Sequence, residues 1–163
     1  MKRLLIVYYS RTGAAWQMAA AVQRGAAAEP EVETRLLTAD EAGPDDLLDA
    51  DGYLFVTPEM LAALAGPMKT FFDRTYYAVL EKIEGRPYAL LVSAGSDGQN
   101  AVRQVARIAA GWRLKAVAEP IIVCTHAQTP EAILAEKTVP AAELQRCEEA
   151  GAALAAGLAL GVF

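Results

Sequence analysis

The fold that we expect is decided near the start of the chain, by Leu4-Leu5-Ile6-Val7-Tyr8-Tyr9-Ser10-Arg11-Thr12-Gly13-Ala14-Ala15. The first six of these residues form a continuous apolar run rich in β-forming side chains, which is typical of a strand buried on both faces of a parallel sheet. After the break at residues 10–13, the alanine-rich segment 14–28 carries apolar residues at helical spacing. The sequence therefore predicts a central strand that leads directly into a helix.

The rest of the chain repeats this alternation. Alternating residues predict a more exposed strand at 31–37, apolar runs predict buried strands at 52–57 and 88–93, and residues 115–124 are expected to form the next strand. Helical spacing predicts helices at 66–82, 101–112 and 141–160. The segments 38–49 and 126–140 are expected to be largely irregular, the first with at most one or two helical turns. Alternating strands and helices predict an α/β fold with a parallel sheet and helices on both faces, in a single domain over residues 1–163.

Composition narrows the choice of partners and location. The chain has 15 Lys plus Arg and 20 Asp plus Glu, a formal charge of −5, which argues against nucleic acid or an anionic membrane surface as the main partner. No apolar run reaches the roughly 18 residues of a membrane span, and Ser10-Arg11 interrupts the first run before a signal peptide is complete. We therefore expect a cytoplasmic protein. Cys124 and Cys147 match neither a disulfide framework nor a metal-ligand spacing, so we expect reduced thiols and no metal site.

Ligands of such sheets bind at the carboxyl ends of the strands, which directs attention to the loops 10–15, 57–66 and 93–98. The first loop precedes a helix, whose free N–H groups and dipole favour an anion. Ser10 and Thr12 add hydroxyl groups, and Gly13 allows close backbone approach. These features predict a phosphate site, with simple capping of the helix by Ser10 and Thr12 as the alternative.

Four motifs stand in order along the chain: Tyr8-Tyr9-Ser10-Arg11-Thr12-Gly13, Thr57-Pro58-Glu59, Gly66-Pro67-Met68-Lys69 with Phe71-Phe72-Asp73-Arg74, and Ser93-Ala94-Gly95-Ser96-Asp97-Gly98. With these motifs the chain resembles the flavodoxin-like superfamily, specifically its NAD(P)H-dependent FMN reductase and quinone reductase branch. The resemblance implies a flavodoxin-like three-layer α/β/α fold with a five-stranded parallel sheet of order 2-1-3-4-5.

The resemblance also implies the chemistry. FMN would be the cofactor, NAD(P)H the reductant and a quinone or similar small molecule the electron acceptor, in a homo-oligomer such as a dimer or tetramer. The phosphate would lie on Ser10, Arg11, Thr12, Gly13, Ala14 and Ala15, one side of the flavin ring on Thr57, Pro58, Glu59, Met60 and Leu61, and its other edge on Ser93, Ala94, Gly95, Ser96, Asp97 and Gly98. Because the cofactor carries the chemistry, we expect no catalytic residue in the chain itself.

Three alternatives stay open. One is an electron carrier like the short flavodoxins. Another is a flavin-free binding module, because Ala15 replaces a hydroxyl residue of the family, and residues 60–65 lack the glycine and aromatic residue that usually face the ring. The spacing in 60–65 also fits a helix extended backward from Gly66 that fills the pocket. The third is a hydrolase, because residues 94–98 loosely imitate a nucleophile elbow, with His126 as the only available base.

Two tryptophans complete the expectations. Trp16 and Trp112 both lie on predicted helices, where a large apolar ring usually anchors the core. The sequence therefore predicts that both are buried. An Asp-Gly pair such as Asp97-Gly98 is also explained by turn geometry alone, without any ligand.

Overall fold

The apolar run near the N-terminus forms strand β1 (Lys2–Tyr8), which lies inside a sheet as its composition predicts. The structure is a computed structural model that describes all residues 1–163. The remaining elements, in chain order, are α1 (Ala14–Ala26), β2 (Val32–Thr38), α2 (Pro44–Asp49), β3 (Gly52–Met60), β4 (Ala63–Leu64), α3 (Gly66–Val79), β5 (Pro87–Ala94), α4 (Gln99–Gly111), β6 (Lys115–Ala116), β7 (Ile121–Cys124), α5 (Pro130–Leu134) and α6 (Ala141–Leu160).

The sheet confirms the flavodoxin-like architecture. Its order is β2-β1-β3-β5-β6, and all these neighbours are parallel. The expected order 2-1-3-4-5 differs in two details. A short antiparallel strand, β4, is added beside β3, and the expected fifth strand is divided into β6 and β7, both paired with β5. The division falls at residues 117–120, where Pro120 has no N–H to donate to the ladder.

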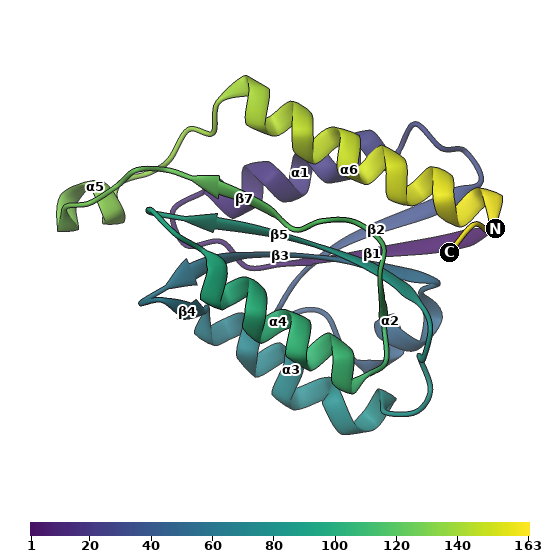
Figure 1. The fold of residues 1–163 in the computed structure, drawn as a ribbon. Helices are drawn as coiled ribbons and strands as arrows, with labels where there is room; N and C mark the ends of the chain where they lie inside the picture. Colours follow the sequence, from purple (N-terminus) through teal and green to yellow (C-terminus); the bar gives the residue numbers. More distant parts are fainter.

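Helices cover both faces of the sheet, which makes three layers (Figure 1). Alternate residues of β1 point to opposite layers because side chains alternate along a strand. Leu4 and Ile6 join the core under α1 and α6, whereas Leu5 and Val7 join the aromatic core under α2, α3 and α4. The carboxyl ends of the strands, the β4 hairpin and α5 gather at one end of the molecule, and both termini lie at the other (Figure 1).

The layer formed by α1 and α6 depends on two glycines. A Cβ added at Gly25 would lie 1.8 Å from the Glu148 carbonyl oxygen, and one added at Gly151 would lie 2.1 Å from the Val22 carbonyl oxygen. The two helix backbones therefore meet directly, and the contact fixes the C-terminal half of α1 against α6.

The two tryptophans differ in burial. Trp112 is fully buried as predicted, donates its indole N–H to the Tyr76 carbonyl at 3.0 Å and stacks on the Tyr76 ring. The prediction for Trp16 is wrong, because its side chain is 46% exposed. Trp16 instead packs against Tyr8 of β1, with ring centroids 5.5 Å apart. Burial, together with nearby Glu41, raises the pKa of Tyr8.

Residues 60–65 do not extend the next helix backward, and that expectation is wrong. Strand β3 continues through Met60, reverses at Leu61 and Ala62, and pairs with β4. Helix α3 starts only at Gly66 because the ring of Pro67, in a longer helix, would collide with the carbonyl of Ala63. None of the helices in the structure has the length and apolar character needed to cross a bilayer.

Candidate functional site

A cavity of about 790 Å³ lies where the loops after β1, β3 and β5 meet. Its volume is within the range of about 300 to 1,000 Å³ that is usual for small-molecule and cofactor sites. Most of the site residues predicted from the sequence line it, namely Ser10, Arg11, Thr12, Ala14, Ala15, Pro58, Glu59, Met60, Leu61, Ser93, Ala94, Gly95 and Ser96. The three predicted loops therefore form one site.

Four predicted residues support the loops without lining the cavity. Gly13 has a φ of +100° and is the N-cap of α1. Thr57 is buried and donates its hydroxyl to the Pro58 carbonyl at 3.0 Å. The carboxylate of Asp97 accepts the Gln99 N–H at 3.2 Å, and Gly98 has a φ of +88° at the start of α4. The turn interpretation of Asp97-Gly98 thus agrees with the geometry.

The first loop presents the N-terminus of α1 to the cavity. Its N-cap is Gly13 without a side-chain cap, so the interpretation of Ser10 and Thr12 as helix caps is wrong. The Ser10 hydroxyl accepts the Gly13 N–H at 3.2 Å instead. The N–H groups of Ala14 and Ala15 donate to no group within the chain. Free donors at a helix N-terminus attract an anion, in accordance with the predicted phosphate site.

The second loop is a hairpin whose tip borders the cavity. Leu61 and Ala62 have φ values of 50° and 60°, and the Leu61 side chain is fully exposed. The carboxylate of Glu59 turns away to α4, where it accepts the N–H groups of Gly98 at 3.0 Å and Ala101 at 3.2 Å. Glu59 therefore supplies the cap that α4 lacks from its own first residues.

The third loop is fixed by the strand beside it. The carbonyl of Ala94 accepts the Thr125 N–H and that of Gly95 accepts the His126 N–H, each at 2.8 Å. A Cβ on Gly95 would lie only 3.0 Å from the Ala127 carbonyl oxygen. Ser96 is exposed and makes no hydrogen bond with His126. The nucleophile–base contact that a hydrolase requires is thus absent from this geometry.

Residues between Thr125 and Lys137 form a further wall of the cavity, which we call the fourth wall. The sequence did not predict it, because residues 126–140 were expected to be irregular. Helix α5 lies inside this segment and begins at Pro130, with the Thr129 hydroxyl accepting the Ala132 N–H. The wall contributes Thr125, Ala127, Gln128, Pro130, Ile133, Leu134 and Lys137 to the lining. The Thr129-Pro130 pair is a helix-start signal that could have identified α5, but its position against the first loop depends on the tertiary structure.

The charges around the cavity are unevenly paired. Glu59 is the one acidic residue in the lining, and its carboxylate is bound to α4. Arg11 and Lys137 are the two basic residues in the lining, and neither has a carboxylate within 4.0 Å. The first loop and the fourth wall therefore carry positive charge without a counter-ion in the protein.

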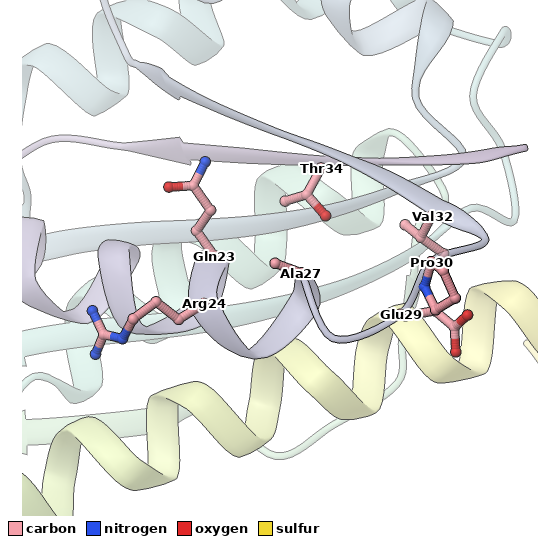
Figure 2. Close-up of a pocket in the computed structure, with 7 residues that line it drawn as sticks. All are labelled: Gln23, Arg24, Ala27, Glu29, Pro30, Val32 and Thr34. Carbon is pink, nitrogen blue, oxygen red and sulfur yellow. The ribbon is translucent and has the colours of Figure 1, made fainter.

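A second hollow of about 480 Å³ lies at the other end of α1 (Figure 2). It is lined by Gln23 and Arg24 on α1, by Ala27 directly after the helix, by Val32 and Thr34 on β2, and by Glu29 and Pro30 in the turn between helix and strand (Figure 2). Arg24 already pairs with Glu148 at 3.6 Å. This hollow lies at the C-terminal end of the helix, where carbonyl groups disfavour an anion, and it is remote from the three predicted loops.

Known proteins resemble this chain in sequence and in fold. The sequence model of the family described as NADPH-dependent FMN reductase matches residues 41–129. A flavodoxin of Aquifex aeolicus (strain VF5) is 34% identical over 60% of this chain and 53% of that protein. An NAD(P)H dehydrogenase (quinone) of Acidithiobacillus ferrooxidans (strain ATCC 53993 / BNL-5-31) is 34% identical over 46% of this chain and 48% of that protein. The chain thus spans about half the length of these curated relatives.

Among solved structures, a flavodoxin from the domain Archaea superposes with a TM-score of 0.77 at 20% identity. The match covers 96% of this chain and 98% of that one. At this identity the likeness establishes the flavodoxin-like fold alone.

Proposed function

The chain belongs to the family of NADPH-dependent FMN reductases, and we propose that it passes electrons from NAD(P)H through bound FMN to a quinone or similar small acceptor. One observation carries the proposal. The free N–H groups of Ala14 and Ala15 and the unpaired charges of Arg11 and Lys137 lie around a cavity large enough for a flavin. This arrangement suits a ligand that carries a phosphate at one end.

The residues present fit FMN in three ways. The Thr12 hydroxyl and the Ala14 and Ala15 N–H groups would hold the phosphate, and Ala15 still offers its backbone donor although it lacks a hydroxyl. Apolar side chains of the second loop and Tyr9, the one aromatic residue in the lining, would exclude water from the ring. The backbone of Gly95 would approach its polar edge, since no side chain intervenes there.

Bound FMN would supply the hydride acceptor and the electron carrier in one group. The work of the chain is then to bind the flavin, orient it and keep water away. The open hairpin at residues 60–64 favours this reading over a flavin-free binding module, because no helix fills the cavity.

A flavodoxin-type electron carrier is the second candidate. It is favoured by the 34% identity to the flavodoxin of Aquifex aeolicus. The two candidates differ in one property, because a reductase oxidises NADH or NADPH directly whereas a carrier needs a separate reductase protein.

The test is an absorption spectrum of the purified protein after incubation with FMN and desalting. We expect flavin bands near about 375 and 450 nm, followed by NADH or NADPH oxidation in the presence of a quinone. Thr12→Glu places a negative charge at the phosphate loop and should abolish FMN retention. Gln23→Glu adds the same charge at the second hollow and should leave retention unchanged.

A colourless wild-type protein after desalting would overturn the FMN proposal. Flavin retention without nicotinamide oxidation would favour the electron carrier. Equal loss of retention in Thr12→Glu and Gln23→Glu would mean that the effect comes from overall charge and not from the first loop.

A further inference from the structure

Residue Lys137 is fastened to the first loop although it is 125 residues away from Thr12 in sequence. Its backbone N–H donates to the Thr12 carbonyl at 2.9 Å. The amide of Gln17 donates to the carbonyls of Lys137 at 2.7 Å and Gly13 at 3.0 Å, and accepts the Val139 N–H at 2.9 Å. Gln17 therefore joins the segment after α5 to the start of α1 and fixes where the Lys137 side chain begins.

The ammonium group of Lys137 has three neutral acceptors. They are the carbonyl of Ile133 at 2.9 Å, the carbonyl of Ala135 at 2.5 Å and the hydroxyl of Thr12 at 3.4 Å. The three N–H donors of the ammonium are thereby used, but its positive charge is not neutralised, since no carboxylate lies within 4.0 Å. The residue is also only partly exposed. A cation held partly out of water is stabilised by an anion.

The position of the Lys137 ammonium indicates which part of a bound ligand would supply that anion. The Lys137 ammonium contacts the hydroxyl of Thr12, in the loop where α1 offers its free N–H groups. We infer that Lys137 binds the phosphate of the flavin and makes the site select FMN over riboflavin, an inference that rests on the proposed function. In this arrangement the ammonium exchanges one of its carbonyl acceptors in the α5 segment for a phosphate oxygen.

The test compares the dissociation constants of FMN and riboflavin, measured by quenching of flavin fluorescence. Lys137→Met removes the charge and keeps the chain length, Lys137→Arg keeps the charge, and Lys82→Met is the matched control. Lys82 is exposed and donates to the carbonyl of Ala78 at 3.0 Å, away from the cavity lining. Circular dichroism and thermal melting establish that each variant is folded.

We expect Lys137→Met to weaken FMN binding by about 10- to 100-fold, as for loss of a charge-assisted hydrogen bond, and riboflavin binding by less than about 3-fold. The dependence of FMN affinity on salt should also become shallower. Lys137→Arg should retain most of the preference for FMN, and Lys82→Met should behave as the wild type.

Two results would overturn this inference but leave the proposed function standing. Equal weakening of FMN and riboflavin in Lys137→Met would assign Lys137 to positioning of the wall, and unchanged FMN affinity would leave it bound to carbonyls only. A wild-type protein that binds neither flavin would overturn the proposed function together with this inference. A Lys137→Met protein that unfolds would shift the decision to Lys137→Arg, whose loss of the FMN preference would count against the inference.

Discussion

At the start of α1, Gly13 adopts a backbone conformation that other residues avoid. Its φ is +100°, and an added Cβ would have only ordinary contacts, the nearest being the Gln17 amide nitrogen at 3.5 Å. The requirement for glycine is therefore conformational and not steric. Gly66 serves as the comparison position. Its φ is not positive, and apart from its chain neighbours no atom lies within 4 Å of an added Cβ.

We expect Gly13→Ala to lower the free energy of unfolding by about 1 to 2 kcal/mol, because a left-handed conformation is strained for alanine. Gly66→Ala should change that free energy by less than about 1 kcal/mol, because the restriction of the unfolded chain is offset by crowding between the new Cβ and the Pro67 ring. Urea unfolding measures both. Similar changes in the two variants would contradict the conformational argument.

At the scale of elements, the second loop combines a strained turn with a remote helix cap. Leu61 and Ala62 connect β3 and β4 as a two-residue hairpin loop with positive φ at both positions. Asn-Gly is the usual pair for such a turn, because both residues tolerate this conformation. The hairpin also begins beside Glu59, whose carboxylate caps α4.

Replacing Leu61-Ala62 by Asn-Gly should raise the free energy of unfolding by about 1 to 2 kcal/mol, because strain is relieved and the fully exposed Leu61 side chain contributes no buried area. Leu61→Ala is the control. It removes the same side chain but keeps the strained backbone, so urea unfolding should show little change. A gain of the same size in the control would locate the effect in the side chain and not in the turn.

Glu59→Ala should lower the free energy of unfolding by about 1 to 2 kcal/mol, because the N–H groups of Gly98 and Ala101 lose their acceptor. Hydrogen exchange at these two amides should become faster. Glu59→Gln keeps one carbonyl oxygen and should lose less. Glu136→Ala, an exposed residue near the other wall, is the control; exchange as fast as in Glu59→Ala would argue against the cap.

At the scale of the whole molecule, two buried groups link stability to alkaline pH. Burial raises the pKa of the Cys147 thiol from its ordinary 9.0 to about 11 and that of the Tyr53 hydroxyl from 10.0 to about 12. Both groups lie in the cores on opposite faces of the sheet. Because the unfolded chain releases these protons first, it binds fewer protons than the native state as pH rises, and stability falls.

We therefore expect the free energy of unfolding to be insensitive to these groups below about pH 9 and to decrease above it. Each group would contribute at most about 2 to 3 kcal/mol. Cys147→Ala should flatten the curve between pH 9 and 11, and Tyr53→Phe between pH 10 and 12. Chemical unfolding across this pH range is the measurement, and a Cys147→Ala curve parallel to the wild type would contradict the assignment.

Local patterns were sufficient for most of the fold. The apolar run of β1 and the spacing in 141–160 each predict their element, because a doubly buried strand and a long helix leave strong periodic signals. The hairpin at 60–64 could not be predicted in this way. Two non-glycine residues with positive φ contradict local preferences, and they are held there by β3 pairing and by the contact of Asn100 with the Ala62 carbonyl at 2.7 Å.

The sequence by itself determined the layered α/β architecture and the three loops that meet at the carboxyl ends of the strands, because both follow from short-range periodicity and from the parallel topology that it requires. Only the tertiary structure decided how those loops are completed. Trp16 is exposed, Glu59 turns to α4, and Lys137 reaches Thr12 across 125 residues. Such contacts depend on which surfaces the packed sheet and helices bring together, and no pattern within one segment encodes them.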